Sequence, residues 1–291
     1  LLDGSQMKIN DAIGQFNAVL FLPQMLQILT GSPQRRRHYL DLTLSQVNTR
    51  YRESLTEYNK ALAQRNALLK QLSERSGDPE QLSYWDEKIT LTGAAVIFDR
   101  IQAIHELDFL AASIHQELTR GEEILRLKYL PSYEPLESPP GQMAMPLDSA
   151  ADRSGLTLSE IQDGYREKII TRQSEDINRG TTSLGPHRDE LRFLSNGIDL
   201  GNYGSRGQLR TTLLSLKLAE VKWLKEKNGD WPVLLLDEVL AELDDTRRQD
   251  LLDRLADSEQ ALLTTTDLGL FSDEFRNSAG LWEIRKGELV R

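Results

Sequence analysis

The sequence has 291 residues, a formal net charge of −10 at pH 7 and no cysteine. This length allows one large domain or two moderate ones, and 39% hydrophobic and 27% charged residues are typical of a soluble globular protein. Without cysteine, disulfides and thiolate metal sites are excluded, which fits a cytoplasmic protein. No apolar stretch approaches the ~20 residues that a membrane helix needs, so we expect no membrane partner. Any contact with nucleic acid must come from a local basic patch, because the chain as a whole is acidic.

The first half of the chain is predicted to be mainly helical. Residues 7–22 predict a strand, a polar turn and a second strand, and Pro33 is well placed to open a helix. Apolar residues spaced by three and four predict long helices over about 44–72 and 82–118. Joined by a short break, these helices form an antiparallel hairpin with arms roughly 40–60 Å long. We favour an ordinary helical subdomain over an extended coiled-coil arm, although the pattern fits both.

The second half alternates strands and helices. Proline, serine and glutamate over 131–148 predict a loop, and Asn196-Gly197 predicts a tight hairpin. The remaining elements are helices over about 156–172, 206–227 and 246–256, strands over about 233–236 and 261–265, and a terminal strand pair within 281–291. Continuous apolar strands that alternate with helices imply a buried, mostly parallel sheet. The predicted fold class is therefore α/β, with a helical arm subdomain inserted into an α/β domain.

Two carboxylates come directly after the apolar strand over 233–236. Asp237 and Glu238 stand where ligands bind in an open α/β sheet, at the carboxyl edge of a strand. In phosphoryl transfer, the first carboxylate of such a pair holds Mg²⁺, and the second orients and deprotonates the attacking water. Taken alone, the same residues also fit a strand that ends in a solvated acidic turn.

A helix that begins near residue 206 carries a second candidate site. Its first turn has the sequence Gly-Ser-Arg-Gly-Gln over residues 204–208. A serine hydroxyl, a closely approaching glycine backbone and a helix N-terminus make an anion site. Alone, the segment also fits a helix capped by serine. Its place before the strand with two carboxylates favours the anion site.

Together these segments resemble the ATP-binding-cassette superfamily. The helix start resembles its signature motif, the strand and carboxylates resemble its Walker B segment, and the turn after them resembles its D-loop. The resemblance implies that Ser205, Gly207 and Gln208 grip the γ-phosphate of ATP held by the opposite subunit. It also implies that Asp244 lies across a dimer interface.

Three segments narrow the resemblance to the RecF family of SMC-like ATPases. Residues 33–41, Pro-Gln-Arg-Arg-Arg-His-Tyr-Leu-Asp, are similar to its Pro-x-x-Arg-Arg-x-Phe-Leu-Asp segment. Residues 185–189, Gly-Pro-His-Arg-Asp, look like a second family segment, and residues 236–247 match its Walker B and D-loop run. The resemblance covers nearly the whole chain.

The resemblance implies a domain organisation and a site. Residues 1–32, with the Q-loop, and 176–291, with the other motifs, are expected to form an ATPase head. Residues 33–175 are expected to form the helical arm subdomain, with a linker near 131–148. The implied ligands are ATP and Mg²⁺. The implied site residues are Glu238 as the catalytic base, Gln24 and Asp237 on Mg²⁺, and Gln24, Ser205, Gly207, Gln208, Asp237 and Asp244 on the nucleotide.

The chain departs in several places from the motif patterns of the family or of the wider superfamily. Gln24 supplies an amide where the family usually has a glutamate in its Phe-Ser-Pro-Glu-Asp segment. Glu238 stands where many family members have aspartate, which is also a carboxylate. Residues 264–267, Thr-Thr-Thr-Asp, lack the switch histidine of the wider superfamily. RecF proteins resemble the chain in this, and the γ-phosphate sensor stays unassigned. No Gly-x-x-x-x-Gly-Lys-Ser/Thr phosphate-binding loop occurs. We expect this loop to precede Leu1, and we expect the 291 residues alone to be inactive as an ATP hydrolase.

The family resemblance implies a DNA-binding ATPase of recombinational repair and replication that serves the SOS response. The implied partners are single-stranded DNA, gapped or junction duplex DNA, a second copy recruited by ATP, RecR and RecO, and indirectly RecA, which the complex helps to load. ATP binding is expected to close a dimeric clamp, and hydrolysis to open it. Slow turnover is expected of such a switch.

Several assignments stay open. Arg35, Arg36 and Arg37 are candidates for contact with DNA phosphates, but a solvated helix turn with ion pairs to Asp41 fits them equally well. The segment with His187 either bridges the nucleotide site and the dimer interface or forms a structural turn. None of the four histidines has the spacing of metal ligands.

Three other functions also remain open. They are an SMC-like chromosomal ATPase, the nucleotide-binding subunit of a transporter, and a catalytically silent fragment. The short predicted helical hairpin argues against the first, and the missing switch histidine argues against the second. A phosphate-binding loop before Leu1 would argue against the third.

Overall fold

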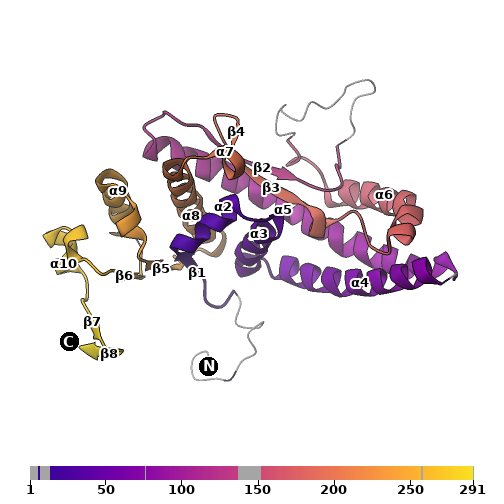
Figure 1. Ribbon diagram of the computed structural model, residues 1–291, viewed down its shortest axis with the longest axis horizontal. Helices are drawn as coiled ribbons and strands as arrows, with labels where there is room; N and C mark the ends of the chain where they lie inside the picture. Colours follow the sequence, from indigo (N-terminus) through magenta and orange to yellow (C-terminus); the bar gives the residue numbers. More distant parts are fainter. Residues whose placement is uncertain (1–5, 7–13, 76, 137–151, 257, 291) are drawn as a thin grey trace.

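The computed structural model describes residues 6, 14–75, 77–136, 152–256 and 258–290 (Figure 1). The first strand predicted within 7–22 falls on residues 7–13, outside the described residues, and the second is β1 (Ala18–Phe21). Figure 1 shows a group of long helices on one side and a small sheet with shorter helices on the other. No helix of the described residues is long and apolar enough to cross a membrane.

A parallel sheet forms the head, in the order β1–β5–β6. The central strand β5 (Val233–Asp237) pairs with β1 on one side and with β6 (Ala261–Thr264) on the other. The helices α8 (Arg206–Asn228) and α9 (Asp245–Ala256) precede and follow β5, which allows parallel connections. This sheet confirms the predicted α/β class. The head also contains η1 (Pro23–Leu26), α2 (Gln27–Thr30), η4 (Val239–Glu242), η5 (Leu268–Leu270), α10 (Asp273–Ser278), β7 (Glu283–Arg285) and β8 (Glu288–Val290).

Four helices form the arm and its base: α3 (Pro33–Val47), α4 (Thr49–Glu74), α5 (Ser83–Leu118) and α6 (Leu158–Arg179). The hairpin predicted from apolar spacing is α4 and α5, joined through η2 (Pro79–Leu82) and packed side by side (Figure 1). The helix α6 packs on both and continues across the predicted domain boundary at 175/176. Gly93 allows this close packing, because a Cβ there would lie 2.9 Å from the Tyr165 ring and 3.0 Å from the Tyr58 ring.

A second, antiparallel sheet lies between the arm and the head. It consists of β2 (Leu125–Leu130), β3 (Glu190–Ser195) and β4 (Ile198–Asp199), and is flanked by η3 (Pro186–Arg188) and α7 (Leu200–Tyr203). The predicted Asn196-Gly197 hairpin joins β3 and β4, with φ of 48° and 80° at the two residues. The sequence did not predict β2, whose alternating residues Leu125, Leu127 and Tyr129 are buried.

Two fully buried arginines tie the arm together. The Arg65 guanidinium on α4 donates to Asp86 on α5 at 2.6 Å and to Asp176 on α6 at 2.7 Å. It also donates to the Thr182 hydroxyl at 2.8 Å. Arg100 on α5 donates in the same way to Asp41 on α3 and to the segment before β3. Buried charges persist only when they are paired, so these contacts fix how the arm helices meet.

Arg65→Met should lower the free energy of unfolding by about 3–5 kcal/mol, because Asp86 and Asp176 lose their buried partner. Urea denaturation followed by circular dichroism measures this loss. Lys60→Met, in an exposed ion pair on the same helix, is the matched control and should leave the free energy of unfolding nearly unchanged. Equal effects of the two substitutions would show that the buried ion pairs do not stabilise the arm.

Candidate functional site

Asp237 ends β5 and Glu238 follows it, and a threonine of the neighbouring strand contacts both residues. The register of β5 and β6 pairs Asp237 with Thr264. The Thr264 hydroxyl donates to Asp237 Oδ1 at 2.6 Å and accepts from the Glu238 backbone N–H at 3.3 Å. One hydroxyl therefore orients the side chain of the first carboxylate and the backbone of the second.

Glu238 has a left-handed backbone conformation, with φ of 54° and ψ of 13°. This conformation is uncommon for a residue with a side chain and costs free energy. It turns the chain sharply from β5 into η4. Strained residues of this kind concentrate at functional sites, where the surrounding structure holds them in place. The position is that of the predicted catalytic base.

Gln24 lies at the same edge of the sheet as Asp237. The β1–β5 register pairs Phe21 with Leu236, so η1 and the carboxylates both follow the carboxyl ends of paired strands. Gln24 and Asp237 are exposed, and each offers oxygen atoms of the kind that Mg²⁺ prefers. Among the described residues there is no group of three or more metal-ligating side chains. A site with one or two protein ligands fits Mg²⁺, which keeps water and phosphate oxygens as its other ligands.

The predicted anion site is a capped helix N-terminus. Ser205 caps α8 through a capping box: its hydroxyl accepts from the Gln208 N–H at 3.2 Å, and the Gln208 side chain accepts from the Ser205 N–H at 3.0 Å. Ser205 and Gly207 are exposed, and a Cβ added to Gly207 would meet no atom closer than 4.0 Å. The turn is thus preorganised and open to an anion from outside.

Asp244 is exposed at the start of α9. The Arg247 backbone N–H donates to it at 3.0 Å, and the Arg247 guanidinium forms an ion pair with it. These contacts, the backbone hydrogen bond first among them, lower the pKa of the Asp244 carboxyl below its usual range. Asp244 is therefore an ionised group on the surface next to the Walker B segment.

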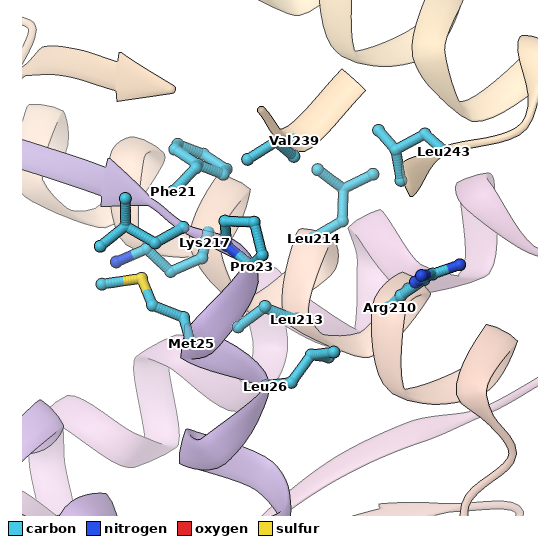
Figure 2. A pocket seen from close by; sticks show the side chains of 11 residues that line it. Phe21, Pro23, Met25, Leu26, Arg210, Leu213, Leu214, Lys217, Val239 and Leu243 are labelled. Atoms are coloured by element: carbon cyan, nitrogen blue, oxygen red, sulfur yellow. The ribbon is translucent and has the colours of Figure 1, made fainter. Parts of the chain in front are cut away.

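An apolar pocket lies between two of the predicted motif segments and the helix α8 (Figure 2). Its lining comes from η1 with Met25, from α8 with Leu213 and Leu214, and from the D-loop segment with Val239 and Leu243. The cavity measures about 30 Å³, whereas ligand pockets measure roughly 300–1,000 Å³. It is too small for a nucleotide. It is a packing contact through which the Q-loop segment, the helix α8 and the D-loop segment share one apolar surface.

Two of the three arginines proposed for DNA contact hold α3 to β3. Arg36 forms a two-pronged ion pair with Glu190, at 2.6 and 2.8 Å. Arg37 donates to the backbone carbonyl of Asp189 at 2.7 Å. Arg35 is exposed and lies at the surface of the helix. The expected partner Asp41 instead binds Arg100.

The segment with His187 forms a packed turn. The His187 Nδ1 atom lies 2.6 Å from the Tyr58 hydroxyl, and its Nε2 atom lies 3.2 Å from the Thr182 carbonyl oxygen. Burial lowers the pKa of His187 to about 4, so the ring is neutral at pH 7. Gly185 has a φ of 127°, which favours glycine. These contacts favour the structural turn, one of the two alternatives left open by the sequence.

Sequence reasoning missed two residues that contact the site. Thr264 had a signal, because a threonine run ends the strand predicted next to the carboxylates. Glu123 had none. It follows α5 by a few residues, yet its Oε1 atom accepts from the Gln208 side-chain amide at 3.3 Å. Only the folded chain brings residues 85 positions apart into this contact.

No protein-family model matches the chain. The DNA replication and repair protein RecF of Chloroflexus aggregans is 38% identical over 293 residues, which cover 99% of this chain and 70% of the relative. RecF of Bacillus subtilis is 38% identical over 287 residues, covering 98% of this chain and 73% of the relative. A solved structure of the recombination mediator protein RecF with ATP, in the RecFOR pathway, has a TM-score of 0.82 and 30% identity. That match covers 99% of this chain and 71% of the solved chain.

Glu238→Gly should raise the free energy of unfolding by about 1 kcal/mol relative to Glu238→Ala, because only glycine adopts the left-handed conformation without strain. Thermal or urea unfolding of the two variants measures the difference. The same pair of substitutions at Asp237, which lies in the extended strand β5, is the control and should reverse the order of stability. If alanine were the more stable residue at 238, the backbone there would not be strained.

Proposed function

Because the chain belongs to the RecF family of DNA replication and repair proteins, we propose that it is a DNA-binding ATPase of recombinational repair and replication. The solved RecF structure with ATP, described within the RecFOR pathway, supports ATP as ligand and DNA, RecO and RecR as partners. The observation that carries the proposal is the sheet edge where Gln24, Asp237 and Glu238 follow paired parallel strands.

Each residue at this edge has a role in the proposed hydrolysis. Asp237 would hold Mg²⁺ with the Gln24 amide oxygen as a second ligand, and the ion would supply positive charge against the phosphates. Thr264 limits the rotation of the Asp237 carboxylate before any ligand binds. Glu238 orients the attacking water and accepts its proton on a carboxylate oxygen.

The phosphates need one further element. In this class of ATPase, the backbone amides and the lysine of a Gly-x-x-x-x-Gly-Lys-Ser/Thr segment hold them, and the 291 residues contain no such segment. We propose that a segment outside these residues supplies it. We use the term loop-bearing protein for a protein that contains both the 291 residues and that segment. Experiments that measure ATP binding, hydrolysis or ATP-dependent dimerisation use the loop-bearing protein.

The second part of the proposal is a clamp made of two copies. Ser205, Gly207 and Asp244 are exposed, so they are open to contact with another subunit. The turn at the start of α8 binds the γ-phosphate of ATP held by the partner copy. ATP binding then closes the dimer around single-stranded, gapped or junction DNA in the cytoplasm, and hydrolysis opens it. Together with RecO and RecR, the closed clamp assists the loading of RecA.

The arm supports this function over that of an SMC-like chromosomal ATPase. The hairpin helices α4 and α5 have 26 and 36 residues, or roughly 40 and 55 Å at 1.5 Å per residue. Such a hairpin reaches along a short stretch of DNA and does not bridge distant segments. The threonines at 264–266, in place of a switch histidine, weigh against the nucleotide-binding subunit of a transporter.

Glu238→Gln in the loop-bearing protein should preserve ATP binding and lower the hydrolysis rate by about 100-fold or more, because the amide cannot accept the proton of the attacking water. Fluorescent-nucleotide titration and phosphate release measure the two effects. Glu288→Gln is the control, because it removes the same charge from the exposed strand β8, 50 residues after Glu238 in the sequence, and should leave the hydrolysis rate unchanged. If Glu238→Gln hydrolysed ATP at the parent rate, Glu238 would not be the general base.

Ser205→Arg separates a clamp from an ATPase that works as a single subunit. The substitution places bulk and a mobile charge where close approach to a phosphate is needed, while Asp237 and Glu238 stay unchanged. Monomer binding of nucleotide should survive, and ATP-dependent dimerisation should fail. DNA retention should fall with it, because each copy supplies only part of the salt-sensitive phosphate contact.

Sedimentation with and without ATP, alongside nucleotide titration, measures both properties of Ser205→Arg. Ser272→Arg is the matched control, because Ser272 caps α10 in the same way and each variant loses one helix cap. If Ser205→Arg dimerised with ATP as the control does, the turn would not act on the partner's nucleotide.

A further inference from the structure

Glu123 joins three separate elements through one carboxylate. It lies in the segment between α5 and β2. Its Oε2 atom accepts from the Ser195 hydroxyl on β3 at 2.8 Å and lies 3.3 Å from His115 Nε2 on α5. Its Oε1 atom accepts from the Gln208 side-chain amide on α8 at 3.3 Å. The carboxylate thus connects the arm helix, the second sheet and the signature-like turn.

The contact with Glu123 fixes both ends of the Gln208 side chain. The amide nitrogen donates to Glu123, and the amide oxygen accepts from the Ser205 backbone N–H at 3.0 Å. Because a carboxylate is only an acceptor and a backbone N–H is only a donor, the amide has one orientation that satisfies both. That orientation closes the capping box around the Ser205 hydroxyl.

The surroundings keep Glu123 in its charged form. Partial burial raises the pKa of its carboxyl, but hydrogen bonds from Ser195, His115 and Gln208 outweigh burial, so the pKa lies below its usual range. The Glu123 side chain is 22% exposed, and the contact is therefore more effective than a pair in open water. His115 is fully buried, and its Nδ1 atom lies 2.9 Å from the Ser215 hydroxyl on α8. Glu123 and His115 therefore contact α8 at two positions, Gln208 in its first turn and Ser215 further along the helix.

We propose that Glu123 is a positioning residue for the γ-phosphate turn, holding Gln208 so that the Ser205 hydroxyl and the α8 N-terminus face a phosphate in a fixed geometry. The inference rests on the proposed function for the identity of the ligand, and on contacts within this chain for the geometry. The structural part and the functional part are therefore tested separately.

The structural part is tested on the 291-residue chain by nuclear magnetic resonance of the Gln208 side-chain amide, assigned by comparison with Gln208→Glu. In the parent chain we expect these two protons to resonate away from the position of a solvated glutamine and to exchange slowly with water. In Glu123→Ala they should move to the solvated position. Glu123→Gln should restore much of the shift, because its amide oxygen still accepts from Gln208.

Glu122→Ala is the matched control for both parts. Glu122 is the neighbouring residue and is exposed. Its backbone N–H donates to the Thr119 carbonyl at 3.1 Å and its backbone carbonyl accepts from the Asn196 side chain at 3.4 Å, and both contacts survive the change to alanine. The substitution removes the same charge and leaves the Gln208 signals in place. If Glu123→Ala left those signals at the parent position, as Glu122→Ala does, the structural part would be wrong.

The functional part is tested in the loop-bearing protein. Relative to the parent, Glu123→Ala should weaken ATP-dependent dimerisation by roughly tenfold or more, as the loss of a hydrogen bond to a charged group implies. Nucleotide binding by the monomer should be unchanged, and Glu123→Gln should recover part of the loss. If Glu123 served only to keep the protein folded, Glu123→Ala would lower nucleotide binding by the monomer and ATP-dependent dimerisation together. Glu123→Gln would then not restore dimerisation selectively.

The outcomes distinguish this inference from the proposed function. If Glu123→Ala and Glu122→Ala dimerise equally well with ATP, the positioning role in nucleotide contact is overturned. If the parent protein itself does not dimerise with ATP, the clamp is overturned, and the Gln208 signals still decide whether Glu123 orders the turn. Circular dichroism of every variant shows whether it is folded. If Glu123→Ala is not folded, Glu123→Gln is the variant that is compared with the parent and with Glu122→Ala.

Discussion

The parallel pairing of β5 with a strand on each side places the functional groups of three distant segments at one edge. In a parallel sheet all strands end at the same edge, so the segments after β1, β5 and β6 must meet there. Register decides the contacts: the Asp237–Thr264 pair brings a hydroxyl against a carboxylate, and that hydroxyl also accepts from the backbone of the strained residue next to Asp237. A slip of one residue would turn each side chain to the other face and separate these groups.

The base of the arm is fixed by buried charge rather than by apolar packing alone. Arg100 crosses from α5 to Asp41 on α3 and to Asp189 before β3, so one guanidinium connects residues from three parts of the chain. Tyr129 on β2 also donates to the Asp189 carboxylate. Removing Arg100 would leave the buried Asp189 carboxylate without its cationic partner, which makes this geometry hard to change. The segment over 185–189, which resembles a family motif, therefore anchors the arm to the second sheet.

The features that the sequence could predict are those with a short-range signal. The α4–α5 hairpin, the β3–β4 turn and the strand β5 have local patterns of spacing or turn chemistry, and all were predicted. The strand β2 was missed although Leu125, Leu127 and Tyr129 alternate as in a strand with one buried face; its pairing with β3, some 65 residues away across the helix α6, has no local signal. The Arg36–Glu190 pair and the Glu123–Gln208 contact span 154 and 85 positions. A run of three arginines looks like a solvated basic patch until the fold supplies a carboxylate and a carbonyl as partners.

These pairings also bear on how an acidic chain could hold DNA. The net charge is −10, and several arginines of the arm are already neutralised: Arg65 and Arg100 are buried against aspartates, and Arg36 is bound to Glu190. These side chains are therefore not available to phosphates, unlike the exposed Arg35. Affinity for DNA rises with the number of phosphates neutralised, so one acidic copy with such paired cations would bind weakly. In the proposed dimer, two copies joined through their nucleotides would double that number and enclose the DNA between two arms, so the proposal makes DNA retention depend on the geometry of the Ser205 turn.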